Sequence, residues 1–253
     1  ALVDLGYQGQ VLNVNLNLGL EGDMVSDLSE EYARAIDFSD ALLATQVPFL
    51  FIEPTMIIDY LDDKMAPTNG LFMLATVKGM VAIGSKESYF LKLLLEQSAF
   101  LPAFKNSVFA MRLSFGHIFT DQFNVIMPLE RFYLGGAYSV RSYEPDFAPP
   151  LGVVTTSDCK DILVPQGGKT MMNACFELRV PIYQNLSGVL FQDLGTLIKS
   201  GAGLGDGELL SATGFGLRYK TPVGPVRFDI GWRPKKGSDS PNFAWFLTIG
   251  NAF

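Results

Sequence analysis

Hydrophobic and polar residues alternate with a period of two along much of this chain. The segment 226–233 shows the pattern most clearly, with apolar side chains on one side and polar or small ones on the other: Val226, Phe228, Ile230 and Trp232 against Arg227, Asp229, Gly231 and Arg233. Period-two alternation predicts a β-strand with one apolar and one polar face. A soluble sandwich would turn the apolar face toward a protein core, whereas a membrane barrel would turn it toward lipid.

Comparable alternation recurs in five other segments: 10–22, 107–118, 171–183, 212–220 and 242–253. Less regular strands are predicted at five more: 29–38, 47–60, 70–83, 87–102 and 187–198. The leucines of 88–101 would also fit one face of a helix. We expect a strand there because the neighbouring segments are strands and polar residues are few. These segments together predict about eleven strands.

Three features favour lipid over a protein core as the environment of the apolar faces. The polar faces carry many charges, which suit a wet barrel interior with counter-charges: Arg112, Glu177, Arg179, Arg218, Arg227, Asp229 and Arg233. Tight connections alternate with extended ones, as periplasmic turns and extracellular loops do. Aromatic residues lie near segment ends, where interfacial girdles form: Tyr183, Tyr219, Trp232, Phe243 and Phe253. The pattern therefore favours a transmembrane barrel over a soluble sandwich.

Composition is consistent with this interpretation. The chain has 253 residues, 48% of them hydrophobic and 18% charged, with a net charge of −7. These values argue against disorder, and an acidic chain without a Lys/Arg run is not expected to bind nucleic acid. No apolar run reaches the roughly 18–20 residues of a membrane-spanning helix. Signal-peptide features are absent at the start, so we expect a mature chain or one whose beginning is missing.

Nothing in the sequence indicates catalysis. His117 is the one histidine, Gly-x-Ser-x-Gly and His-Glu-x-x-His are absent, and the glycine-rich segment 201–207 lacks the Lys-Ser/Thr of a phosphate-binding loop. We therefore expect no enzymatic activity, no cofactor and no metal. Cys159 and Cys175 lack zinc-site spacing; two unpaired thiols are favoured, and a bond between them stays open.

The segment 119–169 is about fifty residues long without clear periodicity, which is unusual unless it has a function. It contains RFYLGGAYSVRSYEP (131–145), with Gly135-Gly136 followed by Val140-Arg141-Ser142-Tyr143. This stretch resembles the BamA/TamA superfamily, which also includes two-partner secretion transporters. In that superfamily, a long extracellular loop with such a motif folds into the barrel lumen. The resemblance continues in order through 176–183, 189–197 and 214–234; it covers 104–253 well and 1–103 only as generic barrel strands.

The resemblance implies roles for individual residues. Arg141 is expected to reach from the loop to Glu177 and Asp193 on the inner wall. The alternation places Glu177 on the polar face, whereas Asp193 would share its face with the apolar Val189 and Phe191. Ser142 replaces a glycine of the family motif. Because a positive φ would cost serine roughly 1 kcal/mol, we expect a different turn at the tip.

The C-terminal strand also resembles the family, in which an alternating aromatic strand ending in phenylalanine is a recognition signal for membrane insertion. The residues that would form this signal and border the seam of the barrel are Phe243, Trp245, Leu247, Ile249 and Phe253.

The resemblance implies an all-β, transmembrane, antiparallel up-and-down β-barrel in the bacterial outer membrane. Residues 1–253 would form one partial barrel domain, about eleven strands of a presumed sixteen, with 119–169 as an extracellular loop in the lumen. The first strands and the POTRA domains would be absent. The expected function is insertion or translocation of other β-proteins; the alternatives are a secretion or passive pore, and a membrane anchor for a fused domain. Expected partners are membrane lipid, unfolded outer-membrane or secreted β-proteins, and periplasmic accessory or chaperone proteins.

Overall fold

The computed structural model of the chain describes residues 2–21, 30–38, 48–83, 89–155, 160–199, 207–222, 224–233 and 242–250. Within these residues, no helix is long and apolar enough to cross a membrane.

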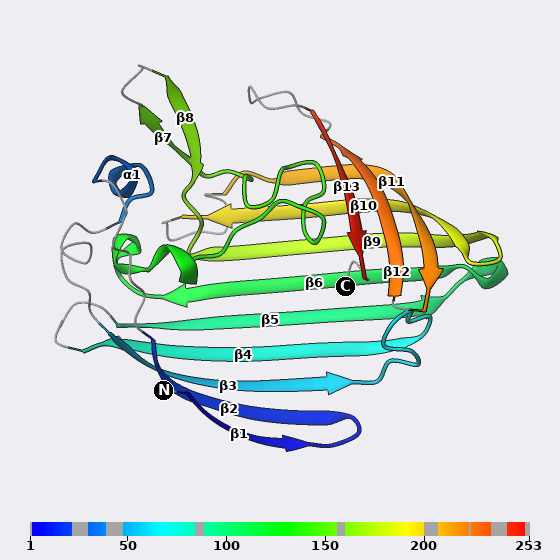
Figure 1. Cartoon of the computed structure of the whole chain (residues 1–253), viewed down its shortest axis with the longest axis horizontal. Coiled ribbons are helices and arrows are strands. Elements are labelled where there is room, and N and C mark those ends of the chain that lie inside the picture. The colour runs from blue at the N-terminus through cyan, green and yellow to red at the C-terminus, as the bar shows by residue number, and fades with distance from the viewer. Residues whose placement is uncertain are drawn as a thin grey trace.

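One antiparallel sheet of eleven strands forms the body of the molecule (Figure 1). Its strands, in spatial order, are β1 (Leu2–Gln8), β2 (Leu12–Glu21), β3 (Phe49–Asp59), β4 (Gly70–Ala82), β5 (Tyr89–Pro102), β6 (Val108–Phe119), β9 (Thr170–Tyr183), β10 (Leu186–Ile198), β11 (Leu210–Thr221), β12 (Gly224–Trp232) and β13 (Phe243–Ile249). Each strand pairs with its neighbour in the sequence, except that β6 pairs with β9 across the segment 119–169. The predicted all-β, up-and-down architecture is confirmed, including a strand rather than a helix at β5.

The charged faces of the strands point inward and the apolar faces outward. On β12, Arg227 and Asp229 are fully buried, whereas Trp232 is 42% exposed. The outer face of the neighbouring β11 is similarly open, with Phe215, Leu217 and Tyr219 all exposed. Exposed apolar side chains around buried charges reverse the arrangement of a soluble protein, and they fit a wall surrounded by lipid.

Two details of the predicted sheet are wrong, although the number of strands agrees. Residues 29–38 were expected to form a strand, but the structure has the short helix α1 (Glu30–Ala35) there. Ala33, within the helix, and Ile36, directly after it, are both buried. The eleventh strand is instead β1, which pairs with β2 from Leu2↔Gly19 to Gln8↔Asn13.

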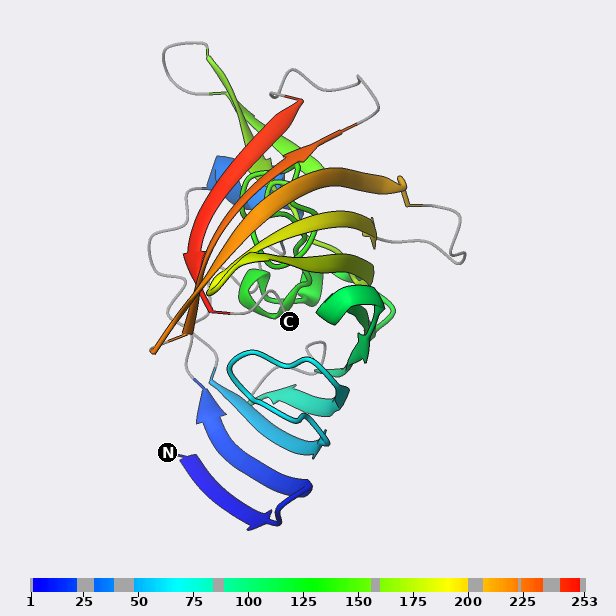
Figure 2. The ribbon, with the colours of Figure 1, turned by 90° about the vertical axis from the view of Figure 1, so that its right-hand side faces the viewer.

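The segment 119–169, called the inserted loop below, leaves β6 and returns at β9. Figure 2 shows the part of it before the hairpin, in green, within the curve of the sheet. It contains two short 3₁₀ turns, Phe123–Val125 and Pro128–Glu130, and then the hairpin β7 (Leu151–Thr155) and β8 (Asp161–Pro165), which projects away from the sheet (Figure 1). This hairpin was not predicted. Its strands are only five residues long, too short for alternation to be distinctive.

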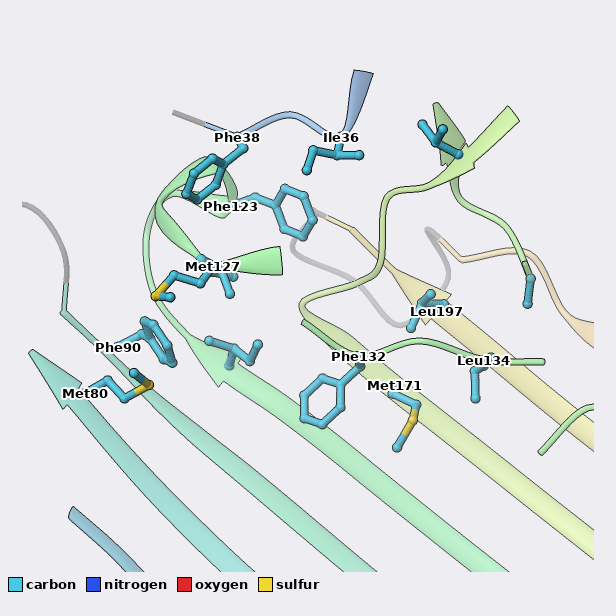
Figure 3. Close-up of a cluster of buried hydrophobic side chains, with 14 of the residues drawn as sticks. Ile36, Phe38, Met80, Phe90, Phe123, Met127, Phe132, Leu134, Met171 and Leu197 are labelled. Carbon is cyan, nitrogen blue, oxygen red and sulfur yellow. The ribbon is translucent and has the colours of Figure 1, made fainter. Parts of the chain in front are cut away.

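A hydrophobic cluster holds the inserted loop against the inner wall (Figure 3). It combines side chains from four regions, namely the end of α1, the strands β4 and β5, the loop itself, and β9 and β10: Ile36, Phe38, Met80, Phe90, Phe123, Met127, Phe132, Leu134, Met171 and Leu197. The ring of Phe132 points its tip at β6, where a Cβ on Gly116 would come within 2.4 Å of the ring atom Cζ. The apolar core of the molecule therefore lies between loop and wall.

Candidate functional site: the Arg141 cluster

The tip of the inserted loop is a compact turn that presents Arg141 to the wall. Gly135 and Gly136 have φ of +113° and +90°, and a Cβ on Gly135 would lie 2.3 Å from the Glu144 carbonyl oxygen. The Gly136 N–H donates to the Tyr143 carbonyl at 3.0 Å, which closes the turn. Only glycine adopts such φ values without strain, so the Gly-Gly tract is needed for the shape of the tip.

Arg141 is buried and bound by two carboxylates of the inner wall. Its Nε and Nη2 donate to the two oxygens of Asp193 at 2.9 and 2.8 Å, and its Nη1 donates to Glu177 at 2.6 Å. Its backbone N–H also donates to Asp193 at 3.1 Å. The guanidinium plane lies 3.6 Å from the centroid of the Phe191 ring. The structure thus brings Arg141 to Glu177 and Asp193, the residues that the sequence suggested as its partners.

Asp193 lies on the inner face of β10 together with Val189 and Phe191, as the alternation predicted. The apolar neighbours that made its assignment weak have a role, because Phe191 supplies the ring on which the guanidinium stacks. Gln192 faces the other way and accepts a hydrogen bond from Thr213 at 2.6 Å.

Further arginines of the wall extend the cluster. Glu177 also accepts from Arg179 at 2.9 Å and Arg218 at 3.1 Å, while Asp229 accepts from Arg218 at 2.6 Å and Arg227 at 2.9 Å. Four arginines therefore meet three carboxylates. The remaining positive charge is directed at backbone, since Arg227 also donates to the Ala137 carbonyl of the inserted loop at 2.9 Å. The counter-charges that we expected around these inward-facing arginines are present in this cluster.

Glycines on the inner wall provide the space into which the tip fits. A Cβ on Gly231 would lie 2.1 Å from the Arg141 carbonyl oxygen, and one on Gly195 would lie 2.7 Å from Val140. Val140 itself is fully buried. Side chains at these two wall positions would displace the tip, so the small residues of β10 and β12 permit the close approach.

Ser142 and Tyr143 complete the motif without strain. Ser142 is not among the positive-φ residues of the described chain, and its hydroxyl donates to the Ser211 carbonyl at 3.1 Å. The turn is closed by the Ser142 and Tyr143 N–H groups, which both donate to the Val140 carbonyl. The Arg233 guanidinium lies 4.2 Å from the Tyr143 ring. A turn that avoids positive φ explains how serine occupies this position.

The last strand presents its predicted residues to the outside. Phe243, Trp245, Leu247 and Ile249 are 53–66% exposed, and they all lie on the outer face of β13. Phe253 lies outside the described residues. Phe246 is an aromatic residue among the small and polar ones of the inner face of β13, and its role was not predicted. It lines a cavity of about 660 Å³ beside the loop tip.

Sequence reasoning also missed the two charges just before the Gly-Gly tract. Glu130 and Arg131 are 6% and 3% exposed, and both bind distant parts of the chain. Two adjacent charges inside an otherwise apolar stretch could have indicated them. Cys175 is a buried free thiol on the inner face of β9, whereas Cys159 lies outside the described residues.

An eleven-stranded antiparallel sheet with apolar residues outside, and charges and an inserted loop inside, defines a transmembrane barrel protein. The chain belongs to the Omp85 superfamily, whose domain model matches residues 2–253. It is accordingly a protein of the bacterial outer membrane.

One curated protein is similar to this chain in sequence, and two solved structures are similar to it in fold. The outer membrane protein assembly factor BamA of Nitratidesulfovibrio vulgaris is 28% identical over 187 residues, which are 72% of this chain and 22% of that protein. The crystal structure of BamA from Haemophilus ducreyi lacking POTRA domains 1–3 has a TM-score of 0.71 and 16% identity, covering 98% of this chain and 52% of that one. CdiB from Acinetobacter baumannii has a TM-score of 0.56 and 11% identity, and the match covers 96% of this chain and 40% of that one. The chain thus spans about a fifth of the curated relative.

Proposed function

We propose that this chain is the part of an outer-membrane barrel that helps insert or translocate other outer-membrane or secreted β-proteins. The buried contact of Arg141 with Glu177 and Asp193 is the observation that carries the proposal. This contact supports a barrel in which a loop is held fixed in the interior, rather than a barrel with an open channel. Relatedness to an assembly factor points the same way, and the mechanism needs no cofactor.

In this mechanism, the seam beside β13 receives the substrate. β13 pairs with β12 from Trp232↔Phe243 to Val226↔Ile249, and the described residues give its other edge no partner. An unpaired edge can template an incoming strand through backbone hydrogen bonds. The exposed apolar face of β13 would keep the growing sheet continuous with lipid.

The second candidate is a secretion pore, favoured by the likeness in fold to CdiB. A pore needs a clear passage, whereas here the loop tip and the Arg141 cluster fill the concave face of the sheet. This filling supports assembly over a standing channel. Unfolded β-proteins would then be the substrates, and periplasmic accessory or chaperone proteins would deliver them.

Site-directed disulfide crosslinking in the native membrane tests the seam. Single cysteines at 244–248 of the full-length protein, with Cys159 and Cys175 replaced by serine, are tested against cysteines in the last strand of an outer-membrane substrate. We expect crosslinks in one fixed register. The matched control is Leu190→Cys, which faces outward on a strand paired on both sides. Crosslinking equal to that control, or without a register, would contradict the proposal.

A further inference from the structure

A second charged contact joins the inserted loop to the wall, away from Arg141. Glu130 is buried, and its two carboxylate oxygens are bound by Lys78 of β4 and Lys92 of β5; the Lys92 Nζ lies 3.1 Å from the carboxylate. Lys78 also contacts Glu21 at 3.0 Å. The polarity is opposite to that of the Arg141 cluster, since here the loop supplies the anion and the wall the cations.

The register of the sheet explains why the wall needs this carboxylate. Lys78 and Lys92 are directly paired residues on adjacent strands. Like charges directly opposite each other destabilise a sheet, and more so where water is excluded. Glu130 lies between the two ammonium groups and offsets their repulsion. The wall is therefore built to hold an acidic side chain from the loop at this point.

The neighbouring residue ties the same point of the loop to other segments. Arg131 donates to the Ile126 and Gln166 carbonyls, both at 3.0 Å, and to those of Ile36 and Asp37 beyond α1, the last at 2.9 Å. Residues 130 and 131 thus fasten the loop to β4, β5 and the connection between β2 and β3. The Arg141 cluster fastens it to β9, β10 and β12.

We propose that Glu130 is a second anchor of the inserted loop, independent of Arg141, and that the loop leaves the wall only when both anchors are released. The two anchors grip different strands through different charges, so loss of one leaves the other intact. Glu130 is a positioning residue in this scheme. The inference concerns how the loop is held and does not require the proposed function to be correct.

Cys175 provides a native reporter for the position of the loop. It is 1% exposed, and its Sγ lies 3.4 Å from the Ser139 carbonyl oxygen of the loop. Release of the loop would uncover this thiol. The rate at which a membrane-permeant maleimide labels Cys175 therefore measures release directly, without any assay of assembly. The background carries Cys159→Ser and serine at any cysteine outside residues 1–253, so that Cys175 is the thiol that reacts.

The experiment compares Glu130→Gln, Arg141→Gln and the double variant of the full-length protein in native membranes. We expect each single variant to speed labelling, and the double variant to speed it by about the product of the two single effects, because independent anchors contribute additively to the free energy that holds the loop. Glu144→Gln is the matched control, since it removes an exposed carboxylate from the same loop.

A second comparison separates charge pairing from general loss of structure. Lys92→Glu alone should speed labelling in the Arg141→Gln background, and Lys92→Glu combined with Glu130→Lys should restore slow labelling, because the exchange keeps opposite charges in contact. Heat-modifiability shows whether each variant is folded. The proposal is overturned if Glu130→Gln adds nothing to Arg141→Gln, or if the exchanged pair labels as fast as Lys92→Glu alone.

Discussion

At the scale of single residues, the two carboxylates that bind Arg141 are not equivalent. Asp193 accepts three hydrogen bonds, all from Arg141, whereas Glu177 also neutralises Arg179 and Arg218. Removing one partner of a buried ion pair costs about 3–5 kcal/mol, because the other charge stays buried without compensation. Substitutions at the two positions should therefore have different consequences.

We expect Glu177→Gln to destabilise the protein more than Asp193→Asn, because it leaves three guanidinium groups without that carboxylate. Arg141→Ala should also destabilise the fold, and Arg141→Lys should restore only part of the loss, since an ammonium cannot make the paired contacts with Asp193. Heat-modifiability and the urea midpoint measure these effects. Lys105→Ala, on an exposed turn, is the control. Equal midpoints for wild type and Arg141→Ala would contradict the account.

A second residue-scale prediction concerns the space at Gly231. We expect Gly231→Ala to displace the loop tip, because the added Cβ would meet the Arg141 carbonyl oxygen at 2.1 Å. Faster maleimide labelling of Cys175 measures the displacement. Gly79→Ala is a matched control, since its nearest contact would be at an ordinary 3.4 Å from Ile52. If the two variants label at the same rate, the close fit at Gly231 is not needed to hold the tip.

At the scale of elements, the long strands were predictable because each has one face in lipid and one inside. Two such environments impose alternation over nine or more residues, as on β9 and β12. The helix α1 was not predictable, because it packs against β7, and because Arg131, about a hundred residues away, donates hydrogen bonds to the carbonyls of Ile36 and Asp37 directly after it. The contact of Arg141 was accessible through an ordered series of motifs. The contact of Glu130 could not be predicted, because only the register of β4 and β5 shows that its partners Lys78 and Lys92 lie opposite each other.

The connection between β3 and β4 gives an element-scale prediction with a defined pH dependence. Slight burial raises the pKa of Asp62, but hydrogen bonds from Thr68, Asn69 and Asp63 outweigh it and lower the pKa to about 2. A carboxylate with a lowered pKa in the fold stabilises it above the ordinary value of 3.8, and this stabilisation is lost as the pH falls toward 2. Protonation should therefore loosen residues 60–69 at acid pH.

We expect Asp62→Asn to make this connection more sensitive to protease at neutral pH, and to remove most of the acid-dependent increase seen in the wild type between pH 4 and about 2. Limited proteolysis with an acid-active protease, or hydrogen exchange of 60–69, measures both. Asp121→Asn, in the inserted loop, is the control. An acid response that persists unchanged in Asp62→Asn would show that another group is responsible.

At the scale of the whole molecule, the concave face of the sheet is occupied. The hydrophobic cluster around Phe132, the Arg141 cluster and the Glu130 anchor lie against the inner face of the strands from β3 to β12. Burying this many charges is costly, and their attraction for one another offsets the cost only while the loop stays in place. A barrel built in this way should resist the flow of ions until the loop moves.

We therefore expect the full-length protein in planar bilayers to show low conductance with brief openings. Combining Glu130→Gln with Arg141→Gln should raise the frequency of openings by about the product of the two single effects, because two independent anchors of the loop are lost. Each single variant should open more often than the wild type, and the control Glu144→Gln should open as often as the wild type. A large, steady open state in the wild type would instead favour the secretion pore, since a transport channel must conduct without dismantling its own interior. Comparing the opening frequencies of the wild type and these variants thus shows whether the buried charges of the loop keep the barrel closed, as assembly rather than transport requires.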